Sequence, residues 1–296
     1  MKKNLNVLHY HIMLMPGIIF LILFSIVPMY GILIAFKDFK PGRGIWGSEW
    51  VGLEHFQFLF TLPDSKTIFF NTIFIAVMKI IAGIIVPLTV ALLLNEARKQ
   101  FFKRSVQTFI YLPHFLSWVI LANIVVDLFS TTGIINQILS VFGVDPIMFM
   151  ASNTWFPAIV IGSDVWKEFG FGTIIYLAAL TGINPSLYES AVIDGATRWQ
   201  QIWYITLPSI KPTIILLATL SLGNILNAGF DQIFNMYNPL VYESGDIIDT
   251  YVYRAGLVEA KFSLATAVGL LKSVVSFVLI MVSYFLASRF ANYRIF

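Results

Sequence analysis

Residues 188–208 read YESAVIDGATRWQQIWYITLP, a polar and charged stretch between two strongly apolar segments. Asn184 and Pro185, just before it, are typical turn and first-turn residues of a helix. A helix that begins there should end near Gly195, because glycine is tolerated at a helix end and destabilises a helix interior. The stretch therefore predicts two short helices joined by a glycine turn, which form an elbow at a membrane surface.

Two pairs of residues in this elbow fit the capping-box pattern. In such a box a Ser or Thr side chain accepts a backbone N–H of the first helical turn, and a Glu or Gln three residues later reaches back to the cap. Ser186 with Glu189 predicts the start of the first helix, and Thr197 with Gln200 predicts the start of the second. One face of the second helix should carry three apolar residues at i, i+3 and i+4 spacing: Trp199, Ile202 and Trp203.

The composition is that of a polytopic membrane protein. Of the 296 residues, 58% are hydrophobic and 12% are charged, and the mean hydropathy is +0.80. A soluble domain has about 25% charged residues. No cysteine is present, which excludes disulfides, thiol chemistry and cysteine-based metal sites. The net charge of +3 fits Lys and Arg at cytoplasmic helix ends better than nucleic-acid binding, so we expect contact with membrane lipid and with no nucleic acid.

Six stretches are apolar over about 20 residues, the length that crosses a bilayer as a helix. They are residues 12–36, 70–94, 105–129, 157–180, 211–235 and 264–287. The first is too long for a secretory signal peptide and is not followed by a small-residue cleavage site, so we expect it to be retained. The pattern predicts an all-α integral membrane protein with a single transmembrane domain over residues 1–296.

The distribution of Lys and Arg predicts the orientation, because these residues favour the cytoplasmic side. With the N-terminus inside, ten Lys and Arg fall on the inner side and six on the outer side. The loop at 95–104 holds four of them, whereas the loop at 130–156 holds none. We therefore expect both termini, and the elbow at 184–208, to be cytoplasmic.

The elbow resembles the EAA loop of permease (transmembrane) subunits of binding-protein-dependent ABC sugar importers. That loop has the form E-A-A-x-x-D-G-A, followed further on by an apolar residue and proline. Ser190 stands where the family usually has its first Ala, a change of one small residue for another. Residues 51–60 and 111–118 are also similar to the oligo- and polysaccharide branch of the maltose-type permease family. The positions that match the loop are Glu189, Ala191, Asp194, Gly195, Ala196, Leu207 and Pro208.

This resemblance implies a six-transmembrane-helix permease core with a cytoplasmic coupling helix in a bacterial cytoplasmic membrane. It implies four partners: a second homologous permease, two cytoplasmic ATPase subunits and an extracytoplasmic sugar-binding protein. ATP and Mg would be bound by the ATPase subunits, so this chain would hold no cofactor and would not itself be an enzyme. Trp199, Ile202 and Trp203 would supply apolar contacts to the ATPase, and Asp194 and Arg198 polar ones. The cargo would be an oligosaccharide or polysaccharide fragment, moved by alternating access.

Polar residues inside the expected spans are the candidates for sugar contact. An ionisable group in a span is costly and by default faces a bundle interior, a partner or a water-filled path. In the fifth span, three polar residues at i, i+3 and i+7 would share one helix face, and amides with carboxylates suit sugar hydroxyls. The alternative is that such residues only pair across helices or with the partner permease. The candidates are Lys79, Trp166, Lys167, Glu168, Asn224, Asn227, Asp231 and Lys272.

The sequence does not decide the contacts of Lys167, Glu168 and His114. Lys167 and Glu168 are adjacent, so their side chains point in different directions and need not pair with each other. His114 is interpreted as an interfacial residue at a helix end.

A second class of function remains open from the residues alone. The chain has no G-x-x-x-x-G-K-[ST] loop, so it has no such cradle for ATP phosphates, and its energy must come from another subunit or an ion gradient. An ion-coupled secondary transporter of a small polar solute would use Asp127, Lys167, Glu168 and Asp231 as relays. Such folds usually show internal repeats, none of which is convincing here, and this function leaves the elbow unexplained. A channel or scaffold is a third alternative.

Overall fold

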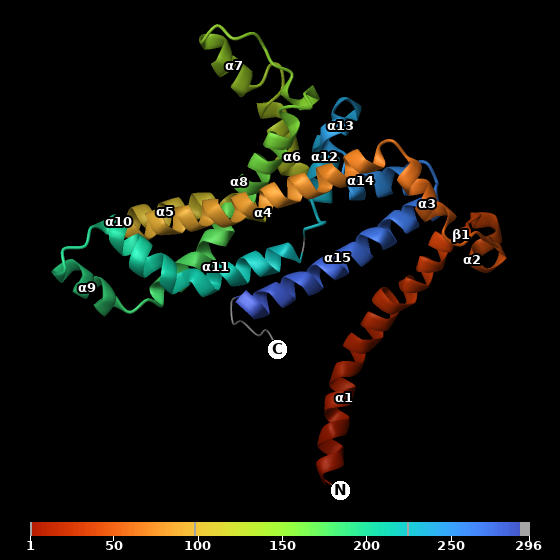
Figure 1. The fold of residues 1–296 in the computed structure, drawn as a ribbon, viewed down its shortest axis with the longest axis horizontal. Helices are drawn as coiled ribbons and strands as arrows, with labels where there is room; N and C mark the ends of the chain where they lie inside the picture. Colours follow the sequence, from red (N-terminus) through yellow and green to blue (C-terminus); the bar gives the residue numbers. More distant parts are fainter. Residues whose placement is uncertain (1, 98, 224, 291–296) are drawn as a thin grey trace. The chain divides into compact units, whose positions relative to one another are not determined.

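The computed structural model describes residues 2–97, 99–223 and 225–290, and these are nearly all helical (Figure 1). The all-α expectation has one small exception within this part of the chain. Strand β1 (Lys37–Asp38) pairs antiparallel with β2 (Glu49–Trp50). The chain divides into two compact units, residues 1–65 with 251–271, and residues 66–250 with 272–296.

The first unit carries the expected first span and the hairpin that follows it. The Phe36 ring, at the end of the span, lies 5.7 Å from the Trp50 ring and 5.4 Å from the Phe56 ring. Val51 N also donates to Phe36 O at 2.9 Å, so the hairpin is fixed to the end of the span. Its helical elements are α1 (Lys2–Leu21), a π-helical turn (Ile22–Ile26), 3₁₀ stretches (Val27–Phe36, Pro41–Arg43), α2 (Gly44–Gly47), α3 (Glu54–Thr61), a π-helical turn (Arg254–Val258) and the start of α15 (Phe262–Phe290).

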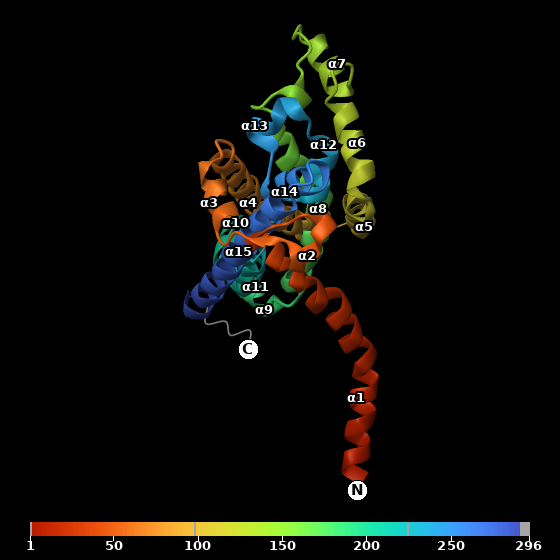
Figure 2. The ribbon, with the colours of Figure 1, turned by 90° about the vertical axis from the view of Figure 1, so that its right-hand side faces the viewer.

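The second unit holds most of the helices. Helix α7 lies beyond the end of α6 in both views (Figures 1 and 2). The long helices are α4 (Ser65–Glu96), α5 (Gln100–Tyr111), α6 (Trp118–Leu128), α8 (Phe156–Thr181) and α11 (Leu207–Leu222), with the rest of α15. The short elements are 3₁₀ turns (Leu112–Phe115, Phe149–Ala151, Pro239–Val241), α7 (Ile134–Val141), α9 (Pro185–Ile193), α10 (Arg198–Gln201), a π-helical turn (Ile202–Thr206), α12 (Phe230–Met236), α13 (Tyr242–Gly245) and α14 (Ile248–Tyr253).

Helices α4 and α8 contribute to two apolar clusters among the described residues of this unit. One cluster joins Ile75 of α4 to Phe156 of α8 and to side chains of α6 and α12, and the other joins Ala91 of α4 to Tyr176 of α8 and to α11. Close contacts also brace α8 against its neighbours. A Cβ on Gly170 would lie 1.9 Å from the Ile110 carbonyl oxygen of α5, so the two backbones are in direct contact.

Pro87, in the interior of α4, is held by α8. Proline removes a backbone donor and tends to kink a helix. Here Thr173 Oγ1 donates to Pro87 O at 3.3 Å, and a Cβ on Gly172 would lie 3.1 Å from the proline ring. The proline is therefore enclosed by α8 and does not interrupt α4.

Four described helices are long and apolar enough to cross a membrane: His9–Phe36, Ser65–Glu96, Arg198–Leu222 and Phe262–Phe285. A fifth results if the bent pair Gln100–Phe115 and Trp118–Leu128 is one span. Helix α8 fills the fourth expected stretch, but carries three charged residues near its middle: Asp164, Lys167 and Glu168.

The expected span at 105–129 is not one continuous helix. The two helices of this region meet at an angle of 106° (Figure 1). Leu116 and Ser117 between them have extended backbone, and Pro113 supplies no N–H to a helix. The chain therefore turns where hydropathy alone shows a continuous apolar run.

The expectation of a helix over 211–235 is wrong. A continuous helical path runs from Arg198 through a π-helical turn to Leu222, so the span begins inside the polar elbow. It ends at Gly223, and α12 begins only after Gly229, whose φ of +95° is left-handed. Asn227 therefore lies in a non-helical segment, and the expected polar stripe on one helix face does not form; Asn224 lies outside the described residues.

Candidate functional site

The glycine turn of the elbow is a Schellman motif, the helix ending in which two late backbone N–H groups cap carbonyls of the last turn. Gly195 N donates to Val192 O at 3.1 Å, and Ala196 N donates to Ala191 O at 2.8 Å. Gly195 has a φ of +76°, which other residues adopt only with strain. The predicted helix end at Gly195 is confirmed.

One predicted capping box is present and the other is wrong. Thr197 N donates to Gln200 Oε1 at 2.7 Å, and Gln200 N donates back to Thr197 Oγ1 at 3.4 Å. At the first helix the cap is Asn184, whose side chain accepts Ser186 N at 3.1 Å. Pro185 occupies the first helical position and has no N–H, so the cap falls two residues before the expected Ser186.

Two side chains connect the arms of the elbow. Tyr188 OH, on α9, lies 2.9 Å from Thr206 Oγ1 in the π-helical turn. Gln201, which is buried, donates from Nε2 to Ala196 O at 3.1 Å. The relative position of α9 and α10 therefore depends on side-chain contacts as well as on the glycine turn.

The outer surface of the elbow is strongly apolar. Trp199 is 71% exposed and Trp203 is 62% exposed, in agreement with a free apolar face. Ile202 is only partly exposed, because the π-helical turn that begins there changes the register. The sequence missed Ile193, which is 86% exposed at the end of α9.

Two residues of the elbow line an open cavity of about 570 Å³ next to the end of α4. Arg198 and Tyr188 line it together with Asn95, Glu96 and Ala97. Arg198 Nη1 lies 3.8 Å from Glu96 Oε2, a contact the sequence did not predict. Glu189 and Asp194 are exposed on the elbow.

A buried polar cluster lies where α4, α8 and α12 meet. Lys79 Nζ donates to Ala228 O at 2.8 Å and to Gln232 Oε1, and it lies 3.1 Å from Asp164 Oδ1. Gln232 is fully buried and donates from Nε2 to Val160 O at 2.7 Å and to Ser163 Oγ at 2.8 Å. The charge of Lys79 is thus balanced by Asp164, as burial of an ion requires.

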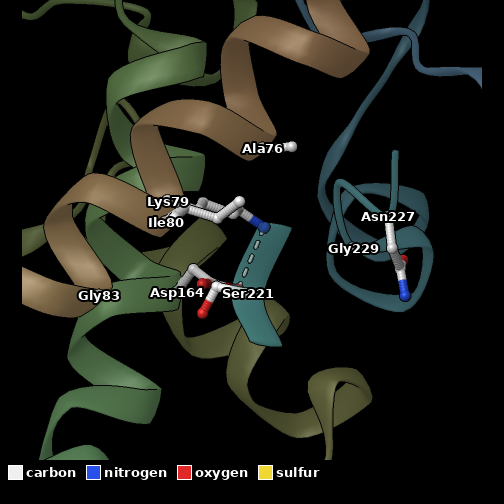
Figure 3. A pocket seen from close by; sticks show the side chains of 8 residues that line it. All are labelled: Ala76, Lys79, Ile80, Gly83, Asp164, Ser221, Asn227 and Gly229. Carbon is white, nitrogen blue, oxygen red and sulfur yellow. Dashed lines mark ion pairs between the residues drawn. The ribbon is translucent and has the colours of Figure 1, made fainter. Parts of the chain in front are cut away.

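An open cavity of about 310 Å³ lies beside this cluster (Figure 3). Lys79 and Asp164 form one part of its wall, and their ion pair is visible as the dashed line in Figure 3. Asn227 and Gly229 of the non-helical segment, and Ser221 near the end of α11, line it as well. The wall therefore combines a carboxylate, an amide and a hydroxyl, which are groups that hydrogen-bond to sugar hydroxyls.

A second polar cluster ties α8 to the bend between α5 and α6. Lys167 Nζ donates to His114 O at 2.7 Å and lies 3.3 Å from Glu168 Oε1. Glu168 Oε2 lies 2.8 Å from His114 Nδ1, and the His114 ring stacks on Phe171 with centroids 4.3 Å apart. Lys167 and Glu168 therefore do pair, because both side chains reach toward His114.

Comparison with known proteins decides the family. Residues 83–292 match the family described as binding-protein-dependent transport system inner membrane component. The chain belongs to this family of permeases. Protein LplB of Bacillus subtilis (strain 168) is 43% identical over 281 residues, which cover 95% of this permease and 88% of the relative. The polygalacturonan/rhamnogalacturonan transport system permease protein YteP of the same strain is 44% identical, with coverage of 95% and 88%.

Solved structures show the same fold. The permease matches a chain of a bacterial ABC transporter involved in the import of the acidic polysaccharide alginate, with a TM-score of 0.90, 41% identity and coverage of 98% of both chains. A bacterial alginate ABC transporter in complex with an alginate pentasaccharide-bound periplasmic protein matches with a TM-score of 0.89 and 40% identity, over 97% of this permease and 96% of that chain.

The structure brings only some of the permease's expected sugar contacts together. Among the residues that the structure describes, Lys79 and Asn227 line the 310 Å³ cavity. Lys167 and Glu168 lie in the cluster around His114, and Lys272 Nζ lies 2.5 Å from Asp249 Oδ1 of α14. Trp166 and Asp231 are exposed on their helices.

The sequence missed Gln232, Asp249 and His114 as partners of these charges. The available signal for His114 was Pro113, which marks a helix break where backbone and side chains find partners outside the helix. In the described ranges, no group of three or more His, Asp or Glu side chains is arranged to hold a metal ion.

Proposed function

We propose that this permease is the transmembrane subunit of an ATP-driven importer that moves an oligosaccharide or polysaccharide fragment across the cytoplasmic membrane. The observation that carries the proposal is the match, over 98% of the chain, to a permease of an alginate importer. YteP, whose name gives polygalacturonan and rhamnogalacturonan as its cargo, supports a saccharide of several units. The wall of the 310 Å³ cavity supplies suitable polar groups.

The transmembrane core would have six spans in one domain. The bent pair of α5 and α6 would count as one span, and α8 would cross the membrane although it carries charges. Two ion pairs support this placement of α8, Lys79–Asp164 and Lys167–Glu168, because paired charges cost less in a membrane than single ones. Both termini and the elbow would then be cytoplasmic, as the distribution of Lys and Arg favours.

The elbow would be the coupling helix that docks on the ATPase. Its exposed Trp199 and Trp203, with Ile202 beside them, would fill an apolar groove, and Asp194 and Arg198 would make polar contacts. Gly195 would set the angle of the elbow through its left-handed backbone. ATP and Mg would be bound by two ATPase subunits, and the sugar would reach the permease pair from an extracytoplasmic binding protein.

The sugar path would pass the 310 Å³ cavity. Asn227 lies in its wall and is exposed, so it is the first candidate for sugar contact among the predicted residues. The other predicted contacts remain proposals that need testing residue by residue: Asn224, Asp231, Trp166, Lys167, Glu168, Lys79 and Lys272.

The test is ATP hydrolysis by the complete importer, produced with the proteins encoded beside it and reconstituted in liposomes. Binding protein loaded with the matching oligosaccharide should stimulate hydrolysis and drive uptake of labelled sugar. Uptake should persist when ionophores collapse the proton and sodium gradients. Uptake that requires an ion gradient and no ATP would overturn the proposal in favour of an ion-coupled transporter.

A further inference from the structure

The Lys79 ammonium already has a full set of partners. An ammonium group has three N–H donors and no acceptor. Its three partners are Ala228 O at 2.8 Å, Asp164 Oδ1 at 3.1 Å and Gln232 Oε1. A sugar hydroxyl would have to displace one of these partners, although Lys79 lines the cavity.

The non-helical segment 225–229 depends on these contacts. Ala228 is fully buried, and its carbonyl accepts a hydrogen bond from Lys79. Gly229 has a φ of +95°, and a Cβ there would lie 2.8 Å from Lys79 Nζ, so the ammonium packs directly against the glycine backbone. Gln232 then ties the start of α12 to α8 through Val160 O and Ser163 Oγ.

We propose that Lys79 is a positioning residue, which holds segment 225–229 against α4 and α8 and thereby places Asn227 in the cavity wall. This rests on the proposed function, because it assigns to Lys79 a role in the same sugar path. The sugar is then contacted by the segment that Lys79 holds, and not by Lys79 itself.

A consequence for sugar choice follows from the charges. Asp164 offsets the charge of Lys79 at a distance of 3.1 Å, so the pair presents little net charge to a sugar carboxylate. Replacing Lys79 should therefore slow transport of neutral and acidic oligosaccharides by the same factor. A direct contact between Lys79 and a carboxylate would instead slow the acidic sugar selectively.

The position of the segment can be measured without any sugar. The chain contains no cysteine, so Leu226→Cys, at a side chain of segment 225–229 that is only 1% exposed, provides the permease of the complete importer with a single thiol that reacts when the segment opens. A charged methanethiosulfonate should label this thiol at least about tenfold faster with Lys79→Met, the effect of losing roughly 1.4 kcal/mol of local stability. Lys66→Met, an exposed lysine at the start of the same helix, should leave the rate unchanged.

A double variant separates positioning from folding. Lys79→Met alone leaves Asp164 as an unpaired, partly buried charge, and the chain then unfolds more easily. Lys79→Met with Asp164→Asn removes that charge, so the melting temperature of the complex should recover. The labelling of Leu226→Cys should stay fast, because Ala228 O still lacks its donor. If the thiol in the double variant is labelled as slowly as in the variant with Lys79 and Asp164 intact, the proposal is overturned.

The sugar experiment supplies the second readout, in a permease without the reporter cysteine. Hydrolysis stimulated by binding proteins loaded with a neutral and with a uronate oligosaccharide should fall by equal factors in the double variant. Asp164 also lines the cavity, so Asp164→Asn alone is the control. A change of more than about threefold in the ratio, roughly 0.65 kcal/mol, that the control does not show would identify Lys79 as a sugar contact and overturn the proposal. If no sugar stimulates the wild-type importer, the proposed function fails, while the labelling rates still decide the role of Lys79.

Discussion

At the scale of single residues, two glycines with positive φ show which backbone conformations a local sequence pattern can predict and which it cannot. Gly195 was predicted because a helix end is a local signal, carried by the residues around it. Gly229 was not, because its backbone depends on the ammonium of Lys79, which comes from another helix. The charged residues in the spans also depend on contacts that are distant in the sequence. Their positions could be predicted, but partners such as Gln232 and Asp249 could not.

Gly195→Ala should weaken coupling to the ATPase. A Cβ there meets nothing within 4 Å, so the effect is confined to the left-handed backbone, which costs about 1–2 kcal/mol for an L-residue. Stimulated ATP hydrolysis should fall several-fold while the permease pair still assembles. Gly182→Ala is the matched control at another helix end, because its φ is −82°; equal loss in both variants would argue against the backbone explanation.

Lys272→Met tests whether Lys272 binds sugar or pairs with Asp249 2.5 Å away. If it pairs, the single change should lower stability by about 1–3 kcal/mol, because Asp249 loses its partner in a partly buried position. Adding Asp249→Asn should restore much of the melting temperature and the transport rate. A double variant that is stable but transports no sugar would support direct contact instead.

At the scale of elements, hydropathy located the long helices but not their breaks. The first, second and sixth expected spans correspond to long helices, because a single lysine or proline does not cancel the apolar character of the whole stretch. The fifth span was expected too far along the chain. Trp199 and its neighbours look like surface residues in the sequence, although they belong to the same helical path as α11. The break at 112–117 was missed because hydropathy does not report backbone angles, and Pro113 was the one local signal of a bend.

Tyr188→Phe should loosen the elbow without changing its surface. The change removes the hydroxyl that lies 2.9 Å from Thr206 Oγ1, and a hydrogen bond of this kind contributes about 1 kcal/mol. Thr206→Val removes the other partner, so the two changes together should cost less than the sum of each alone. Strict additivity in melting temperature and stimulated hydrolysis would show that the two hydroxyls do not act as a pair.

At the scale of the whole molecule, family and cargo class were accessible because the EAA-like stretch is short and contiguous. The sugar path was less accessible, because its wall is assembled from α4, α8, α11 and a non-helical segment. In the proposed function the apolar elbow docks on another subunit, and in this chain alone that role is visible only as exposed tryptophan side chains.

Trp199→Ala with Trp203→Ala should prevent the ATPase from binding. Large exposed aromatics at the centre of an interface typically contribute about 2 kcal/mol or more each. The permease should still insert and pair with its partner, but the ATPase should no longer co-purify. Trp46→Ala, which is 82% exposed in the first unit, is the control and should leave the complex intact. Retention of the ATPase by the double variant would exclude this face as the docking surface.

Helix α4 is a single rod of 32 residues that touches both places where function is proposed. Glu96 meets Arg198 of the elbow, and Lys79 meets the cavity segment. At about 1.5 Å of rise per residue these two points lie ~25 Å apart along the helix. Pro87 lies between them, but the contacts from Thr173 and Gly172 stiffen the rod at the point where it would otherwise bend. We therefore expect a displacement of the elbow to move the cavity segment as well, because α4 connects them as one body and α8 supports its middle.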